Sequence, residues 1–338
     1  ENAYLDPRSL AAQHKFVKII IERYKDCPSL IWDWINEPSM MDPNRLWVNR
    51  PNRDGFELEE WRGWLRRRHG DIDTLRDAWH VRSDEVPSFD AAPVPSEADF
   101  TLEKGFLRGR RPLRVLDFNL FCQDVFTEWA GTLRDLCRSL GSQQLVTVGQ
   151  DEGGCYDRPS PMQHANVVDF TCVHTWWQND SLLWDGILTN VRGVPNVVEE
   201  TGVMYVENPD GEAWRSEERT AALLERKYLY SLASASAGTI QWIWNSFSLA
   251  MDDNENSIGF TRADGTKKPE FGVHRRMARF WWKNRQFWTG RREDPVALIV
   301  PTSAQLSVQS GSIEATRRVV KVFTKALHTG VQAVSELD

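Results

Sequence analysis

In the first part of the chain, a segment with helically spaced hydrophobic residues is followed by a short continuous run of them. Residues 10–25 place apolar side chains at mostly three- and four-residue steps, which is typical of an amphipathic helix. The next apolar run, residues 30–35, is short and rich in branched and aromatic side chains, and it stops before Pro38, which cannot extend a strand ladder. The pattern therefore predicts a helix followed by a buried strand.

The same alternation continues along the chain. Four further strands are predicted, at 144–149, 167–174, 196–200 and 239–244. Helices are predicted at 113–140, 181–191, 213–235 and within 265–288. Strands that alternate with helices imply a parallel sheet.

Residues 47–112 interrupt this alternation. Two helices are predicted there, at 56–69 with Gly70 as the C-cap and at 71–80, followed by a long loop rich in Pro, Asp and Arg. We interpret this stretch as an insertion on the side of the domain where the carboxyl ends of the strands lie.

A second unit begins after the charged residues 291–294. Residues 296–300 predict a strand and residues 312–327 a helix. We expect 1–290 to form one domain and 291–338 to begin a second, flavodoxin-like α/β domain.

The strand count shapes the fold prediction. Five strand–helix units precede residue 290, whereas a closed parallel barrel needs eight. We therefore predict an α/β fold of the (β/α)8 TIM-barrel type that lacks its first three strand–helix units, so that the five strands are strands four to eight. An open five-stranded sheet is the alternative.

Composition narrows the classes of function. The net charge is 41 − 48 = −7, which disfavours nucleic acids and anionic membranes as partners, and no run of about 18 apolar residues predicts a membrane span. The five cysteines form no C-x-x-C pair, so we expect reduced thiols and no metal site. Sixteen tryptophans weakly favour a carbohydrate ligand, because aromatic faces stack on sugar rings.

Two predicted strands end in carboxylates. Asn36-Glu37-Pro38 closes the first strand, and Glu199-Glu200-Thr201-Gly202 closes another. Parallel barrels hold their chemistry at the carboxyl ends of their strands, and a pair of carboxylates is the minimum apparatus for glycoside hydrolysis. Glu199 remains the rival of Glu200, although strand alternation would place the two on opposite faces.

Together with the strand that contains Trp242, these motifs resemble the retaining β-glycosidases of clan A, which are built on (β/α)8 barrels. The resemblance covers residues 1–290 and implies that Glu37 is the acid/base and Glu200 the nucleophile. It also implies a set of substrate-binding residues: Asn36, His174, Trp176, Trp242 and Trp244. Asn36 would contact the sugar 2-hydroxyl, and Trp244 is the alternative to Trp242 as the stacking platform.

Two families within the clan share features with the chain. Residues 61–79 are similar to the inserted segment of family 42 β-galactosidases, and the unit after residue 296 resembles the start of that family's second domain. Family 5 glycanases share Asn-Glu-Pro and the Trp-x-Trp-Asn pattern of 242–245. Trp176 stands where clan members commonly place a tyrosine, the family 42 zinc-binding cysteine cluster is not apparent, and the clan's strand-two arginine would precede this sequence.

The resemblance predicts a retaining hydrolase of β-galactosides or related β-glycosides that acts through a covalent glycosyl-enzyme. We expect a carbohydrate substrate, no cofactor, and any homo-oligomer to form through the second domain. The alternatives are a family 5-like β-glycanase and a non-catalytic carbohydrate-binding barrel or inactive fragment.

Overall fold

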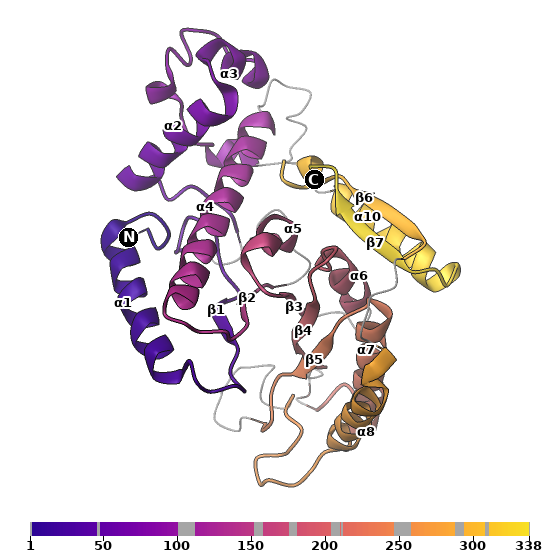
Figure 1. The fold of residues 1–338 in the computed structure, drawn as a ribbon. Coiled ribbons are helices and arrows are strands. Elements are labelled where there is room, and N and C mark those ends of the chain that lie inside the picture. Colours follow the sequence, from indigo (N-terminus) through magenta and orange to yellow (C-terminus); the bar gives the residue numbers. More distant parts are fainter. Residues whose placement is uncertain are drawn as a thin grey trace.

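The computed structural model describes residues 2–45, 48–100, 112–151, 158–175, 181–203, 210, 212–246, 258–287, 294–307 and 311–337. Within these ranges, strands and helices alternate along the chain (Figure 1). The chain therefore has an α/β fold, as the sequence predicts.

Five strands precede the last unit and lie in two parallel sheets: β1 (Trp32–Asn36) and β2 (Val146–Gly149) form the first, and β3 (Thr171–Thr175), β4 (Asn196–Thr201) and β5 (Gly238–Gln241) form the second. β1 pairs with β2, and β4 pairs with both β3 and β5. The backbone hydrogen bond from His174 N to Gln150 O, 2.7 Å long, joins β2 to β3. The order of the strands in space thus follows their order in the chain.

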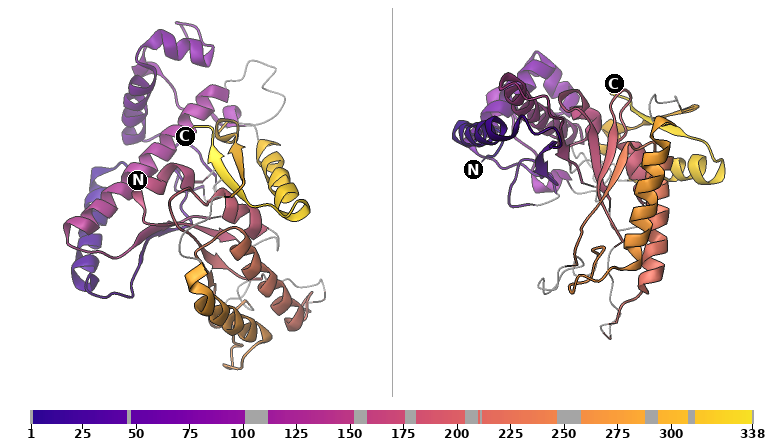
Figure 2. Two further views of the ribbon diagram at one scale, coloured as in Figure 1. Left: turned by 45° about the vertical axis from the view of Figure 1, so that its right-hand side comes forward. Right: turned by 60° about the horizontal axis from the view of Figure 1, so that its bottom comes forward.

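Six helices accompany these strands: α1 (Pro7–Tyr24), α4 (Pro112–Ser139), α5 (Pro161–His164), α6 (Ser181–Leu188), α7 (Glu217–Ala233) and α8 (Pro269–Asn284). α7 and α8 lie side by side (Figure 2) and share the buried apolar cluster that includes Leu224 and Met277. The sequence predicts all of them except α5, which is only four residues long. The predicted helix 213–235 begins later than expected, because the Ser216 side chain caps its amino end by accepting a hydrogen bond from Arg219 N.

The stretch interpreted as an insertion contains α2 (Gly55–His69) and α3 (Ile72–Trp79), which pack on α4. Gly70 ends α2 with a φ of 77°, a conformation that glycine adopts without steric cost. Two short 3₁₀ turns follow, at Phe89–Ala91 and Glu97–Phe100. The two predicted helices of the insertion are confirmed.

One buried carboxylate, Asp117 of α4, ties the insertion together. It accepts hydrogen bonds from Arg68 Nε (3.0 Å) and Trp79 Nε1 (2.7 Å), and it lies 2.9 Å from His69 Nε2. The ring of Trp61 stacks on the rings of both Trp64 and Trp79 above this contact. Helices α2, α3 and α4 therefore share one polar centre beneath an aromatic stack.

Replacing Asp117 with alanine should destabilise the protein by about 3 kcal/mol, because the Trp79 indole and the His69 ring lose a buried partner. Urea denaturation measures this change. Asp135→Ala on the same helix is the matched control: its carboxylate is exposed and pairs only with Arg134, so we expect a loss below about 0.5 kcal/mol. Equal losses in the two variants would contradict the assigned role of Asp117.

The last unit contains β6 (Val296–Val300), α9 (Thr302–Gln305), α10 (Gly311–Lys321), a π-helical turn (Val322–Ala326) and β7 (Val331–Ser335). β6 and β7 are parallel, and their sheet packs against α6. The sequence predicts β6 and most of the helix but not β7. The division of the chain at residue 291 stays a prediction.

The search for membrane-crossing helices found no candidate among the described residues.

Candidate active site

Glu37 lies directly after β1, where the ladder with β2 contains one extra residue. Asp33 pairs with Thr147 and Asn36 with Gly149, so three steps along β1 match two along β2. Gly149 permits this arrangement, because an added Cβ would lie 2.6 Å from an Asp33 carboxylate oxygen. Glu37 N then donates to Gly149 O, and Glu37 has a φ of 45°, a left-handed conformation that is uncommon for glutamate.

Glu200 lies at a second bulge, in β4. Val198 pairs with Val173 and Glu200 with His174, which leaves Glu199 as the extra residue. Glu200 Oε2 lies 2.8 Å from His174 Nδ1, and Glu199 Oε2 lies 3.7 Å from His174 Nε2. The expectation that Glu199 and Glu200 face opposite sides of the sheet is therefore wrong, since a bulge interrupts the alternation on which it rested.

His174 is the centre of the site. Its side chain is 2% exposed, and Nδ1 lies 3.1 Å from Glu37 Oε1 as well as 2.8 Å from Glu200 Oε2. Burial alone would lower the pKa of His174, but the neighbouring carboxyl groups of Glu199, Glu200 and Glu37 raise it to about 11. The ring is therefore an imidazolium at neutral pH, held between both predicted catalytic carboxylates.

Two sets of side chains could hold a metal ion by composition: Glu37 with His174 and Glu200, and Cys172 with His174 and Glu199. His174 belongs to both sets. An imidazolium has no free lone pair, so a metal ion would have to displace a tightly held proton. The site is better suited to proton chemistry than to metal binding.

Of the predicted substrate-binding residues other than His174, the structure places Asn36 and Trp242 next to the two carboxylates. Asn36 is exposed beside Glu37, and Trp242 is 41% exposed and donates its backbone N–H to Thr201 O, next to Glu200. The Trp244 ring makes edge contacts with Phe260 and Phe271, with centroids 6.1 and 5.8 Å away. Trp176 lies outside the described residues.

Lys227, which the sequence analysis did not single out, is fully buried behind the site. Its Nζ donates to Gly202 O at 2.6 Å and to Thr175 O at 3.3 Å, so it connects the carboxyl ends of β4 and β3. A sequence signal exists, because Lys227 falls within the buried stripe of α7 between Leu224 and Ser231.

The pH dependence of stability should report the charge on His174. Because the folded-state pKa of about 11 exceeds the unfolded value near 6.5, the stabilisation is complete below about pH 6.5 and is lost as pH rises toward 11. The stability advantage of the wild-type protein over His174→Gln should therefore shrink by several kcal/mol between about pH 7 and 10. Chemical denaturation at a series of pH values measures it.

The matched control is His164→Gln. Burial lowers the pKa of His164 to about 3, so its contribution changes only between about pH 3 and 6.5 and should be constant from pH 7 to 10. A constant difference for His174→Gln over the same range would show that the imidazolium does not form.

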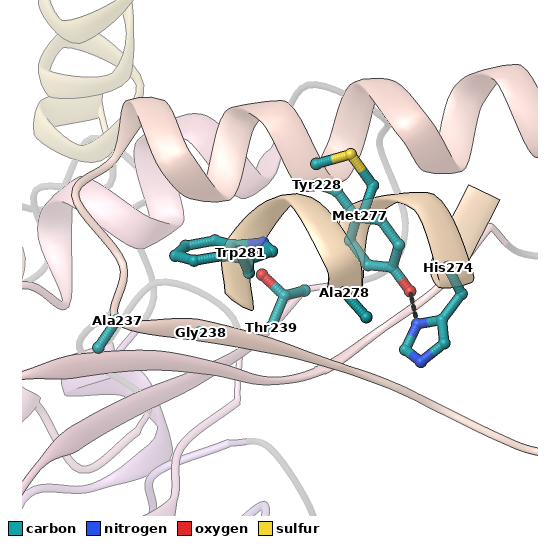
Figure 3. A pocket seen from close by; sticks show the side chains of 8 residues that line it. All are labelled: Tyr228, Ala237, Gly238, Thr239, His274, Met277, Ala278 and Trp281. Atoms are coloured by element: carbon teal, nitrogen blue, oxygen red, sulfur yellow. Dashed lines mark hydrogen bonds between the residues drawn. The ribbon is translucent and has the colours of Figure 1, made fainter. Parts of the chain in front are cut away.

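A cavity of about 220 Å³ lies elsewhere, between α7, α8 and the start of β5. Figure 3 shows the Tyr228 hydroxyl pointing to His274 Nδ1, 3.1 Å away, with Met277 beside Tyr228 and Trp281 farther along the cavity wall. Thr239 marks this as the amino-terminal end of β5, whereas Glu200 lies near the opposite, carboxyl end of the neighbouring strand β4. The cavity is therefore separate from the candidate active site.

A family model described as β-galactosidase, of glycoside hydrolase family 42, matches residues 4–186, more than half of the chain. No curated protein matches the sequence.

Solved structures share the fold. The β-galactosidase from the psychrophilic Marinomonas ef1 has a TM-score of 0.74 at 14% identity, and the match covers 98% of this chain and 54% of the β-galactosidase chain. Gan42B, a family 42 β-galactosidase from G. stearothermophilus, has a TM-score of 0.74 at 13% identity, with coverages of 99% and 50%. The GH5_18 protein from Streptomyces cattleya, solved with GlcNAc, has a TM-score of 0.60 at 12% identity, with coverages of 100% and 69%. The chain thus spans about half the length of these β-galactosidases.

Proposed function

Because this chain belongs to glycoside hydrolase family 42, the β-galactosidase family, we propose that it carries the acid/base and nucleophile of a retaining β-glycosidase. The observation that carries this proposal is the arrangement of Glu37 and Glu200 around His174. Their nearest carboxylate oxygens lie within 4.8 Å of one another. Retaining enzymes place the two carboxyl groups about 5–5.5 Å apart, whereas inverting enzymes leave about 6.5–9.5 Å for a water molecule.

In the proposed reaction, Glu200 attacks the anomeric carbon while Glu37 gives its proton to the leaving oxygen. This step forms a covalent glycosyl-enzyme and releases the aglycone. Glu37, now a carboxylate, then takes a proton from water, which attacks the anomeric carbon and regenerates Glu200. The products are the free sugar with retained configuration and the alcohol.

We assign His174 a positioning role in this reaction. Its imidazolium lies against the carboxyl groups of both Glu37 and Glu200 and fixes Glu200 beside Glu37. This differs from the expectation of a polar subsite residue, because the Nδ1 atom contacts the two carboxylates rather than open space. Asn36 and Trp242 remain the proposed contacts to the sugar.

The five strands are, in this proposal, strands four to eight of a (β/α)8 barrel. The parallel order β1 to β5, with the site residues following one end, supports it. The inserted helices are part of that domain, and the β6–β7 unit begins a second one. A polypeptide that also carries strands one to three should hydrolyse a chromogenic β-galactoside, whereas this chain alone should be inactive or nearly so.

The substrate proposal is tested with aryl β-glycosides that share one leaving group. We expect the β-galactoside to give the highest kcat/KM, ahead of the β-glucoside and the β-mannoside. A preference for the glucoside or mannoside would favour the family 5-like alternative, whose supporting observation is the fold shared with the Streptomyces cattleya GH5_18 protein. Saturable binding of all three without turnover would indicate a non-catalytic carbohydrate-binding barrel.

A further inference from the structure

A cavity of about 360 Å³ opens between the amino-terminal ends of α7 and α8. Its walls come from four places: Val203 follows β4, Ser246 follows β5, Thr220 lies near the start of α7, and Glu270 lies in the first turn of α8. None of its described lining residues is Glu37, His174 or Glu200. The ribbon of Figure 2 shows α7 and α8, whose first turns frame it, running alongside each other.

Two polar atoms at this cavity have no hydrogen-bond partner among the described residues. The Glu270 side chain is 3% exposed; its Oε1 pairs with Lys268 Nζ at 3.2 Å, but its Oε2 is buried without a partner. Ser246 Oγ is likewise buried and unpaired. A buried polar group without a partner is unfavourable, so a ligand that satisfies both atoms gains affinity from them.

The charges at the cavity select the kind of ligand. The Arg262 guanidinium is already engaged by both carboxylate oxygens of Glu217, and Lys268 is engaged by Glu270. The free acceptor, Glu270 Oε2, would repel an anion and needs a donor. A hydroxyl group supplies that donor without adding charge, and a second hydroxyl can pair with Ser246 Oγ in either direction.

The remaining walls fit a sugar ring. Val203 and Ala213 offer small apolar surfaces to its C–H groups, and Arg215 and Arg262 also line the cavity. The volume lies within the usual range of small-molecule pockets, which combine apolar walls with a few convergent polar groups. The cavity therefore has the properties of a site for one neutral, hydroxyl-rich ring.

We propose that this cavity is a second carbohydrate site that binds a neutral glycosyl residue through Glu270 Oε2 and Ser246 Oγ. It is separate from the pair Glu37 and Glu200, and it does not depend on the reaction proposed above. A glycan chain could occupy it whether or not the chain hydrolyses that glycan.

The test is NMR of the full chain carrying ¹³C-methyl alanine and valine, because Ala213, Ala263 and Val203 place methyl groups at the cavity. Methyl β-D-galactopyranoside, methyl β-D-glucopyranoside and methyl β-D-mannopyranoside are titrated separately. At least one should shift these methyl signals saturably, with a Kd in the millimolar range. Glu270→Gln should weaken that Kd about tenfold or more, because it removes a charged acceptor.

Ser246→Ala provides a second variant that leaves the Lys268–Glu270 pair intact, and it should weaken the same Kd severalfold. The matched control is Glu225→Gln, a carboxylate of α7 that pairs with Arg276 away from the cavity and should leave the Kd unchanged. In Glu200→Gln the cavity shifts should persist, which separates this site from the catalytic one. The proposal is overturned if none of the glycosides shifts the three methyls, if both cavity variants keep the wild-type Kd, or if only inorganic phosphate saturates the shifts.

Discussion

Replacing Glu200 with alanine should lower kcat by about 10⁴-fold or more on every aryl β-glycoside, whatever its leaving group. The reason is that, in the proposed reaction, Glu200 is the group that forms the glycosyl-enzyme. Glu200 Oε2 lies 2.8 Å from His174 Nδ1. Glu200 directly follows the bulge near the carboxyl end of β4. Steady-state kinetics on the complete barrel measure the loss.

Glu199→Ala is the matched control, because Glu199 is the adjacent carboxylate and lies farther from the His174 ring, at 3.7 Å from Nε2. We expect it to retain far more activity than Glu200→Ala. The assignment of the nucleophile would be reversed by the opposite outcome, in which Glu199→Ala is inactive and Glu200→Ala turns over at a near-normal rate.

Replacing Glu37 with alanine should have an effect that depends on the leaving group. General acid catalysis contributes about 10²–10⁴-fold, so substrates with poor leaving groups should lose that much in kcat/KM. Aryl glycosides with good leaving groups need little protonation, and their first step should be nearly unaffected. The second step, which needs Glu37 as base, should then become rate-limiting and allow the glycosyl-enzyme to accumulate.

Azide distinguishes this role from a structural one. It needs no base and fits the space left by the Glu37 side chain, so it should restore turnover of the Glu37→Ala variant and yield a β-glycosyl azide. Glu200→Ala provides the comparison, because it should give no azide of β configuration. Formation of an α-glycosyl azide from Glu37→Ala, or of none, would contradict the assignment of Glu37 as the acid/base.

The fold could be predicted well wherever the apolar pattern was long. The eighteen-residue α1 followed from its helical spacing, and β6 followed from an unbroken run of five apolar residues. The sequence analysis missed α5 and β7 for different reasons. The four residues of α5, which begin at Pro161, are too few to show a helical period. Val331–Ser335 contains only two strongly apolar residues, and it becomes a strand through its parallel pairing with β6.

The candidate site was predictable in its residue types but not in its geometry. Carboxylates at the ends of predicted strands indicated Glu37 and Glu200. The β4 bulge that brings Glu199 to the His174 ring could not be predicted from the pattern of hydrophobic and polar residues. Nor does the sequence show that His174, 137 positions after Glu37, lies between the two carboxylates. Such contacts depend on how neighbouring strands are aligned, which local spacing does not specify.

The bulge in β4 also determines the electrostatic potential of the site. It places Glu199 and Glu200 around a single imidazolium, His174, with Glu37 as a third carboxylate. Three carboxyl groups therefore surround one cation, and in the proposed reaction their negative field would act on the bound sugar. Positive charge develops on the sugar ring in the oxocarbenium-like transition state of glycoside hydrolysis, so this field stabilises the ring most strongly at that moment.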